Sequence, residues 1–367
     1  MKKLLLTTAL AGATLVASNA IAQTTVTGNL DISYRAVSND RADKKQDNFR
    51  GFGKESQINI ANKGKLTNGM DYVAGFSLEF DGNDTGLSTT GAHDNLSGGI
   101  NGENTYIDLI SGNTTITFGA DHIQNPDSHG HINPAGVGYI TAYTAGVAGL
   151  YPTGANSIYS GYGAGVVQTL PGFGKVSVNY SPNPTFASSN VSGTVGPEIG
   201  NEHKAASYDG AAESAYEIGF VGDFGVKGLN VLAFRTTETN KQDATAATSK
   251  VKGHRVGASY NFGQVTVGLD MVETTSAGNA TTASAEVDGK AASITFAATK
   301  DLSLGLTYGK ADSSLADTVD EKIKLVSLGY NLGPVAVNAT IRDVENQGGA
   351  TANGDTRDAI VRLSTKF

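Results

Sequence analysis

Val265-Thr266-Val267-Gly268-Leu269-Asp270-Met271 alternates strictly between large apolar residues and residues that are polar or small. An alternation with a period of two is typical of a β-strand with one apolar and one polar face. The pattern recurs along the chain, for example in Val26–Tyr34, Tyr72–Phe80 and Leu302–Tyr308. We count about 16 such segments after residue 22, and only the sixth, around Ile158–Thr169, and the ninth, Leu229–Thr236, show no clear facing.

The segments between these predicted strands alternate in length. Seven short links, such as Ser111–Thr114 and Asn331–Pro334, alternate with eight long ones, such as Val37–Gly53 and Asp81–Gly102. An up-and-down antiparallel barrel produces this alternation, because its short turns lie at one end and its long loops at the other. A two-layer sandwich would also bury the apolar faces, but its Greek-key connections would mix the lengths.

The sequence therefore predicts an all-β protein, a transmembrane antiparallel up-and-down β-barrel whose apolar faces contact lipid. Strands can span a membrane only in a closed barrel, because every backbone polar group must be paired there. A barrel of about 16 strands is too wide for side chains to fill, so it encloses an aqueous lumen. Inward positions should then be polar or small, as Thr266, Gly268 and Asp270 are.

The first 22 residues have the pattern of a cleaved signal peptide. Met1-Lys2-Lys3 is followed by an apolar run to Ala17, and Ala20-Ile21-Ala22 offers a cleavage site before Gln23. We expect residues 1–22 to be removed and residues 23–367 to form a single barrel domain. Without the signal peptide, 25 Lys and Arg residues oppose 35 Asp and Glu residues.

Composition excludes several classes of protein. The chain has no cysteine, which excludes a disulfide framework and cysteine-based chemistry. No apolar run after the signal peptide approaches the roughly 18 residues of a membrane-spanning helix. The acidic balance, without basic clusters, argues against nucleic acid as a partner.

One connector, residues 120–156, is too long for an ordinary loop of a compact domain. It fits the fold if it enters the space that the barrel encloses, so we predict a constriction loop in a pore. Between Asp121 and Asn156 it contains no Lys, Arg or Glu. The titratable residues that we expect at the constriction are Asp121, His122, Asp127, His129 and His131. Their spacing matches no closed metal site, so no metal and no cofactor are predicted.

The closing strand ends the chain on an outward Phe367, and several segments here resemble a known family. They are Ala61-Asn62-Lys63-Gly64-Lys65-Leu66, Asn104-Thr105-Tyr106-Ile107-Asp108-Leu109 and Leu170-Pro171-Gly172-Phe173-Gly174. Their order and spacing, over the whole chain, resemble the general diffusion porins of Gram-negative outer membranes.

This resemblance implies a water-filled channel in the cell outer membrane for passive diffusion of small hydrophilic solutes and ions, and no enzyme activity. It also implies a homotrimer, an inward-folded third loop, and a second loop that contacts a neighbouring subunit. Outer-membrane lipid and lipopolysaccharide would surround the barrel. The resemblance further implies that the barrel-assembly machinery recognises Phe367 as an assembly signal.

In the family, arginines on the wall opposite the third loop form a basic ladder, but this chain has Gln57, Glu103 and Tyr159 at the matching positions. Arg35, Arg342 and Arg362 fall on neighbouring strands of a closed barrel. They form either a substitute ladder or separate ion pairs with carboxylates such as Asp358 and Asp31. The pore-wall residues that we predict are Arg35, Gln57, Glu79, Glu103, Arg255, Asp270, Arg342 and Arg362.

Counting charges by face predicts a weakly cation-selective pore, because acidic residues lead on inward positions and the constriction loop adds two aspartates. Protonation of its three histidines would weaken this preference in acid. Two alternatives belong to other classes. An outer-membrane hydrolase would need a nucleophile beside His254 or His203, and no G-x-S-x-G element accompanies either. A structural or adhesin barrel would need a plugged lumen.

Overall fold

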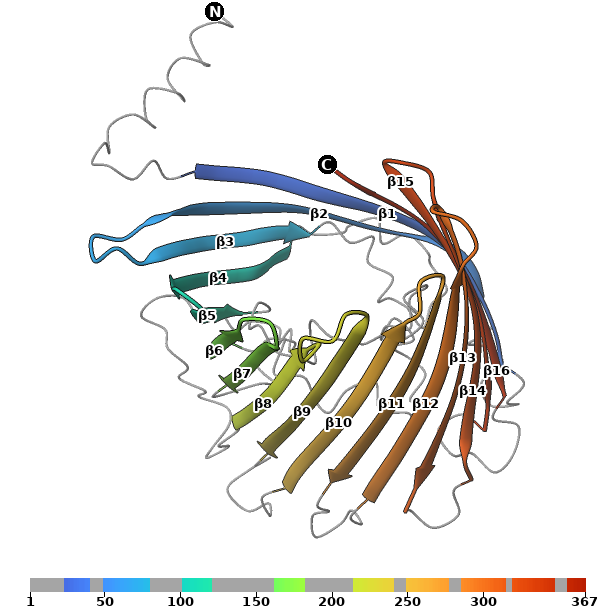
Figure 1. The fold of residues 1–367 in the computed structure, drawn as a ribbon. Coiled ribbons are helices and arrows are strands. Elements are labelled where there is room, and N and C mark those ends of the chain that lie inside the picture. The colour runs from blue at the N-terminus through green and yellow to red at the C-terminus, as the bar shows by residue number, and fades with distance from the viewer. Residues whose placement is uncertain are drawn as a thin grey trace, which may run out of the picture.

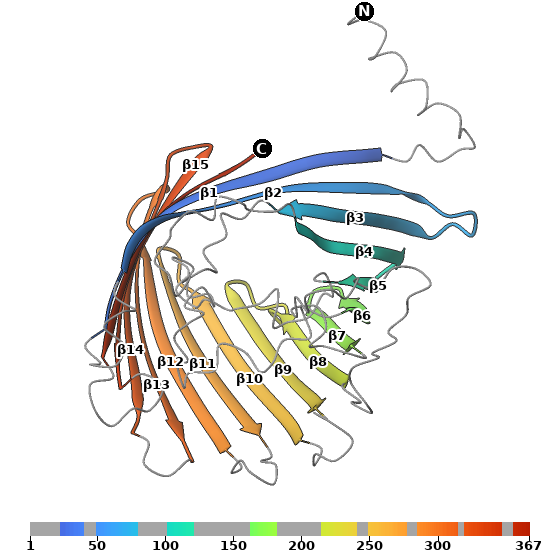
Figure 2. The ribbon, with the colours of Figure 1, turned by 180° about the vertical axis from the view of Figure 1, so that it is seen from behind.

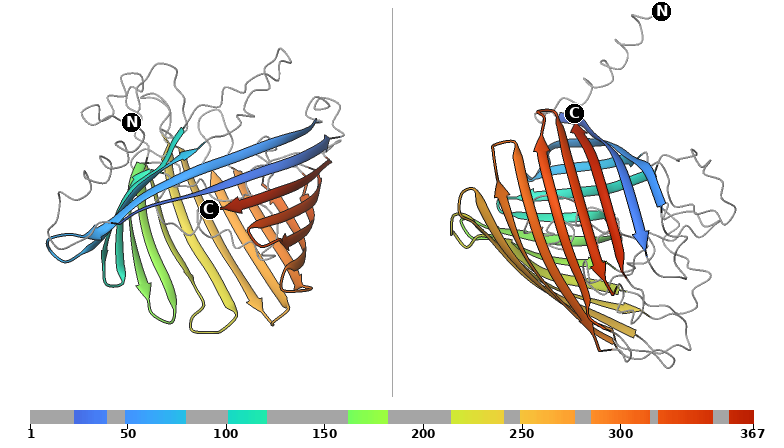
Figure 3. Two further views of the ribbon diagram at one scale, coloured as in Figure 1. Left: turned by 90° about the horizontal axis from the view of Figure 1, so that it is seen from above. Right: turned by 90° about the vertical axis from the view of Figure 1, so that its right-hand side faces the viewer.

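Sixteen antiparallel strands follow one another around a closed barrel (Figure 1). The computed structural model describes residues 23–39, 49–79, 101–120, 162–181, 214–240, 249–276, 285–314, 319–346 and 355–367. Among these residues there is no helix that is long and apolar enough to span a membrane. Figure 2 shows the same order of strands from behind, and Figure 3 shows that they run obliquely around the wall.

The strands are β1 (Gln23–Asn39), β2 (Phe49–Lys65), β3 (Asp71–Glu79), β4 (Asn101–Ser111), β5 (Thr114–Ala120), β6 (Tyr162–Leu170), β7 (Gly174–Ser181), β8 (Ser214–Gly222), β9 (Leu229–Asn240), β10 (Ser249–Asn261), β11 (Val265–Ser276), β12 (Ala285–Ala297), β13 (Leu302–Ser313), β14 (Glu321–Asn331), β15 (Val335–Glu345) and β16 (Thr356–Lys366). Each pairs with its neighbours in sequence, and β1 pairs with β16. The predicted number of strands, their antiparallel order and the closure are confirmed. The seven short links lie within the described residues, whereas every long connector includes residues outside them.

The turns at the short-link end owe their geometry to particular residues. Asn261 and Asn331 each accept, through Oδ1, a hydrogen bond from the backbone N–H two residues later, of Gly263 and Gly333, at 2.9 Å. Both glycines have positive φ angles, 92° and 84°, which a side chain would disfavour. The same Asn-x-Gly arrangement therefore forms both the β10–β11 and the β14–β15 turn.

The two faces of the wall differ as the alternation predicts. On β11, Leu269 and Met271 are 65% and 55% exposed on the outside, while Gly268 and Asp270 are buried on the inside. Outward apolar side chains recur around the barrel, for example Val256, Leu306 and Val326. These exposed apolar residues form the surface that a membrane would cover.

Strand β9 corrects the expectation that inward positions are polar or small. Leu232 and Phe234 are 0% and 5% exposed, and Phe234 lies directly opposite the inward Arg255 of β10. Both apolar side chains therefore point into the barrel and pack together with Val221 of β8. The outward positions of β9 hold Ala233 and the exposed Arg235. This reversal explains why the ninth segment shows no clear facing in the sequence.

Strand β6 begins at Tyr162, and residues 158–161 of the predicted segment lie outside the described residues. Gly165 and Val167 pair with inward residues of β7, and Val166 is 42% exposed on the outside. Small or apolar residues thus occupy both faces of β6, so the sequence shows little contrast there.

The barrel closes where the chain's last residue meets β1. The backbone N–H of Gly28 donates to the carbonyl of Phe367 at 2.7 Å, and that of Phe367 donates to the carbonyl of Gly28 at 3.0 Å. The Phe367 ring lies on the outer face over Gly28, because a Cβ added at Gly28 would meet ring atom Cζ at 2.5 Å. Gly28 therefore provides the space that the terminal ring occupies.

Candidate functional site

The inner wall near the β1–β16 seam carries a network of arginines and carboxylates. Arg35 of β1 donates from Nε and Nη2 to the two carboxylate oxygens of Asp358, at 3.0 and 2.8 Å. Arg342 of β15 lies directly opposite Asp358 in the register, and its Nη2 is 3.5 Å from the same carboxylate. Asp358 thus holds two guanidinium groups that come from the strands on either side of it.

The third arginine of the seam has two carboxylate partners. Arg362 of β16 donates through Nη2 to Asp31 of β1 and, at 3.2 Å, to Glu55 of β2. Its side chain is 11% exposed, and those of Asp31 and Glu55 are 12% and 26% exposed. The geometry decides between the two sequence interpretations: the three arginines do lie on neighbouring strands, but each is paired with carboxylates and they do not form a bare basic ladder.

A fourth inward arginine lies across the barrel on β10. Arg255 donates to both oxygens of Asp270 on β11, from Nε at 3.0 Å to Oδ1 and from Nη2 at 2.6 Å to Oδ2. Both side chains are almost fully buried, at 6% and 4% exposure. The inward apolar Phe234 is the cross-strand neighbour of Arg255 on β9. The two residues lie on adjacent strands and contact each other through both carboxylate oxygens, so their charges compensate each other.

Carboxylates outnumber arginines on the inward face of the described strands. Away from the short-link end, the inward arginines number four, and the inward carboxylates whose side chains are described number eight: Asp31, Glu55, Glu79, Asp108, Glu217, Asp270, Glu321 and Asp358. Hydrogen bonds orient several of them, since Thr117 donates to Asp108 at 2.6 Å and Asn179 donates to Glu217 at 3.4 Å. Close to the short-link end, the inward positions instead hold four lysines, Lys63, Lys65, Lys175 and Lys366, and one carboxylate, Asp71, which Lys65 contacts at 2.6 Å.

The remaining predicted wall residues lie on β2 to β4. Gln57 faces Glu79 directly across the β2–β3 pair, and Glu79 is 7% exposed. Glu103 pairs through its backbone with Ser77 of β3. The predicted constriction residues Asp121, His122, Asp127, His129 and His131 lie outside the described residues, as do Tyr159 and His203. Among the residues that are described, no three His, Cys, Asp or Glu side chains are grouped to hold a metal ion.

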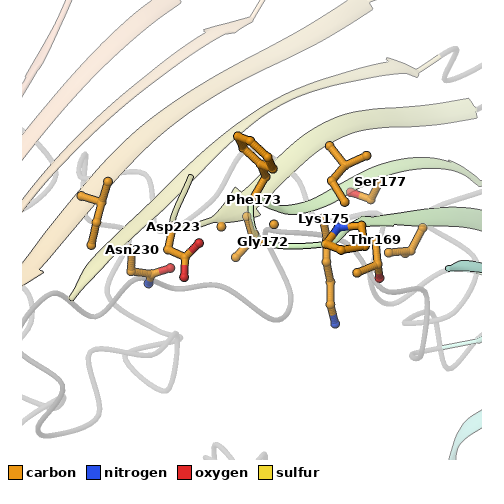
Figure 4. Close-up of a pocket in the computed structure, with 14 residues that line it drawn as sticks. Thr169, Gly172, Phe173, Lys175, Ser177, Asp223 and Asn230 are labelled. Atoms are coloured by element: carbon orange, nitrogen blue, oxygen red, sulfur yellow. The ribbon is translucent and has the colours of Figure 1, made fainter. Parts of the chain in front are cut away.

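A recess of about 610 Å³ opens at the short-link end of the inner wall (Figure 4). It lies between the β6–β7 turn and the start of β9, where the backbone N–H of Asp223 donates to the carbonyl of Phe173 at 3.0 Å. Lys175 and Asp223 bring opposite charges to a lining that is otherwise mainly apolar or uncharged. The recess shapes one mouth of the lumen and contains none of the predicted site residues.

Sequence reasoning missed three carboxylates of this wall, Glu55, Asp108 and Glu321. The signal for Glu55 was present, because it lies two residues before Gln57 and a strand returns to the same face at every second position. Asp108 belongs to a segment that was singled out only for its resemblance. Glu321 begins β14, where the prediction placed a loop end.

Comparison with known proteins agrees with this geometry. A family model described as Gram-negative porin matches residues 7–349. An anion-selective porin from Comamonas acidovorans superimposes with a TM-score of 0.65 at 14% identity, covering 94% of this chain and 100% of the other. A loop-deletion mutant of OmpT, an outer membrane protein of Vibrio cholerae, has a TM-score of 0.65 at 13% identity, with 94% and 99% covered.

A mutant of the Rh. blastica porin has a TM-score of 0.59 at 14% identity, with 94% of this chain and 100% of the other covered. At these identities the likeness shows the fold. No curated protein sequence matches the chain significantly.

Proposed function

The chain belongs to the Gram-negative porin family, and we propose that its channel, in the cell outer membrane, is weakly selective for cations at neutral pH. The observation that supports this selectivity is the excess of eight inward carboxylates over four inward arginines along the described wall away from the short-link end, where the inward lysines lie. Carboxylates that line a pore favour cations, and low-dielectric walls strengthen their field.

The placement of the arginines supports the same conclusion. Arg35 and Arg342 share Asp358, Arg362 contacts Asp31 and Glu55, and Arg255 is closed on Asp270. The opposite charges of a pair about 3 Å apart largely cancel at distances greater than their separation, and salt further screens exposed charges beyond a Debye length of roughly 8–10 Å. The four arginines and the carboxylates that they contact therefore largely offset each other, and the excess of negative charge comes from the other carboxylates of the wall.

Anion selectivity belongs to the Comamonas acidovorans protein by its own description. Selectivity depends on individual charged residues of the lumen, and at 14% identity these are not shared as a rule. The similarity of the two barrels therefore does not determine the selectivity of this chain, which depends on the charged residues of its own wall.

Further features of the channel are part of the proposal. Residues 120–156 form the constriction loop, residues 1–22 are a signal peptide, and the barrel assembles as a homotrimer in contact with lipopolysaccharide. The loop is supported by its length, which exceeds that of an ordinary connection in a compact domain.

A channel without enzyme activity fits the described residues better than a barrel hydrolase. His254 lies opposite Arg235 and Glu273, on the outer face of β9 to β11, away from the lumen. Its directly opposite cross-strand neighbours include no Ser or Thr that it could activate. The plugged structural barrel predicts no ion conductance, which the same recording tests.

The experiment is single-channel recording in a planar bilayer, with the reversal potential measured across a salt gradient at pH 7 and pH 5. We expect conductance, a modest cation preference at pH 7, and a smaller preference at pH 5 as His122, His129 and His131 gain protons. Anion preference at pH 7 would refute the selectivity proposal. Absence of conductance from correctly folded protein would favour the plugged barrel.

A further inference from the structure

The outer face of β12 to β16 changes from apolar to charged at one level. From the short-link end upward, the outward residues are Phe296, Ile294, Ala292 and Lys290 on β12; Leu304, Leu306, Tyr308 and Lys310 on β13; Tyr330, Leu328, Val326 and Lys324 on β14; Val337, Ala339, Ile341 and Asp343 on β15; and Leu363, Val361, Ala359 and Arg357 on β16. On each strand, three apolar outward residues are followed by a charged one. This change marks the upper edge of the membrane-facing apolar surface.

The charges at this edge are mostly positive. Four of the five strands begin their charged part with Lys290, Lys310, Lys324 or Arg357, and the exception, Asp343, accepts a hydrogen bond from Arg357 at 2.5 Å. Outward carboxylates lie farther from the apolar surface, at Asp288, Asp312 and Glu345. We call Lys290, Lys310, Lys322, Lys324 and Arg357 the basic border.

Three lysines of the basic border form a row across adjacent strands. Lys290 lies directly opposite Lys310, and Lys310 lies directly opposite Lys322. Like charges in directly opposite positions repel and destabilise a sheet. A row of this kind is therefore costly to the protein unless anions lie against it.

The carboxylates of the protein offset this row only in part. Lys310 contacts Asp320 at 2.8 Å. Lys322 is 3.9 Å from Glu345, which Lys324 also contacts, so two lysines share one carboxylate. Lys290 is exposed and has no carboxylate within 4.0 Å among the described residues. Cations thus exceed the carboxylates in contact with them directly above the apolar surface.

We propose that the basic border binds the phosphate groups of an anionic lipid headgroup in the outer leaflet of the membrane. Long loops of such barrels face the outside, which places the border at the level of the outer-leaflet headgroups. Basic residues at that level attract anionic lipids. The proposal rests on the barrel lying in the outer membrane and is independent of its ion selectivity, because these lysines face away from the lumen.

The test uses the full protein in detergent micelles, titrated with lipid A that carries two phosphates, and with dephosphorylated lipid A. Lipid binding is counted by native mass spectrometry. The variant Lys290→Gln/Lys310→Gln/Lys322→Gln removes the row. The matched control, Lys227→Gln/Lys300→Gln/Lys366→Gln, removes three charges at the opposite end of the barrel.

At about 1 kcal/mol for each lysine at a lipid surface, the row variant should bind diphosphorylated lipid A about 100-fold more weakly, since 1.4 kcal/mol is tenfold. The control should bind as the unmodified protein does. Equal binding by the row variant, an equal loss in the control, or equal affinity for the dephosphorylated lipid would overturn the proposal. Displacement of the lipid by millimolar inorganic phosphate would assign the site to free phosphate and overturn the lipid assignment.

Folding and channel activity are checked separately in the same variants. Lys290→Gln alone breaks no ion pair among the described residues, so a change in its lipid binding cannot be attributed to a folding defect. Its affinity for diphosphorylated lipid A should fall about fivefold. Single-channel conductance should stay unchanged in the row variant. A protein that binds lipid A through the border but does not conduct would contradict the channel and leave this inference intact.

Discussion

The seam between Gly28 and Phe367 allows a quantitative prediction about how the barrel closes. In Gly28→Ala, the new Cβ would lie 2.5 and 2.6 Å from ring atoms Cζ and Cε2 of Phe367, and 2.9 Å from the carbonyl oxygen of Gln57. Carbon atoms prefer a separation of about 3.5–4.0 Å, so the ring must move by roughly 1 Å. Overpacking costs about 1–3 kcal/mol in a packed core. The ring is 72% exposed and can move, whereas the Gln57 carbonyl belongs to the backbone, so we expect a cost at the lower end of this range.

Removing the ring should remove the part of that cost that the ring causes. In a Phe367→Ala background, Gly28→Ala meets only the Gln57 carbonyl, while the two backbone hydrogen bonds between residues 28 and 367 involve no side chain. We therefore expect the two substitutions to be coupled by about 0.5–1 kcal/mol, in the lower part of the range for contacting residues. Gly51→Ala on β2 is the control, because a Cβ there meets nothing within 4 Å.

The assay is urea unfolding of the purified barrel, followed by the shift between folded and unfolded migration on a gel. At a constant slope, a lower midpoint reports lower stability. Gly28→Ala should lower the midpoint, and Gly51→Ala should leave it unchanged or raise it slightly. Adding Gly28→Ala to Phe367→Ala should lower the midpoint by less than Gly28→Ala does in the unmodified protein. Equal effects of Gly28→Ala with and without the ring would show that the ring does not occupy the space over Gly28.

Three further predictions concern the lumen. Arg255→Ala should destabilise the barrel by about 3–5 kcal/mol in the same unfolding assay, because it leaves the carboxylate of Asp270, 4% exposed, without its arginine. An unchanged midpoint would mean that water or another group replaces the guanidinium. Asp358→Asn should shift the reversal potential toward anions, because it uncovers Arg35 and Arg342, whereas Arg362→Gln should shift it toward cations; shifts of the same sign would contradict local charge compensation. Deletion of residues 136–149 should raise single-channel conductance, and a folded deletion variant with unchanged conductance would exclude these residues from the constriction.

Much of the fold follows from the sequence, because each face of a strand repeats every two residues. The facing of Leu269 and Asp270 is readable from their neighbours alone, and the short links identify one end of the barrel. Strand β9 escapes this reasoning, because Leu232 and Phe234 face inward against the expected polarity. Their facing is set by the register with β8 and β10, which no local pattern contains.

The side chains that meet across the seam were harder to predict for a similar reason. Arg35 and Asp358 are 323 positions apart, and Arg362 and Asp31 are 331 positions apart. Alternation places each of them on the inward face, but only the register of β1 on β16 brings them within hydrogen-bonding distance. A shift of the register by two residues would preserve every facing and change every one of these partners.

The register therefore determines the electrostatics of the channel as well as its closure. With the observed pairing, both Arg35 and Arg342 lie beside Asp358, so positive charge near this part of the seam exceeds negative charge by one. At Arg362 the excess is reversed, because Asp31 and Glu55 share a single guanidinium. The two groups lie at different positions along β1 and β16, near Asp358 and near Arg362, so an ion that passes the seam meets a positive and a negative region in turn. Their net charge is zero, and the balance between cations and anions then depends on the carboxylates elsewhere on the wall, including Asp108 of β4 and Glu217 of β8.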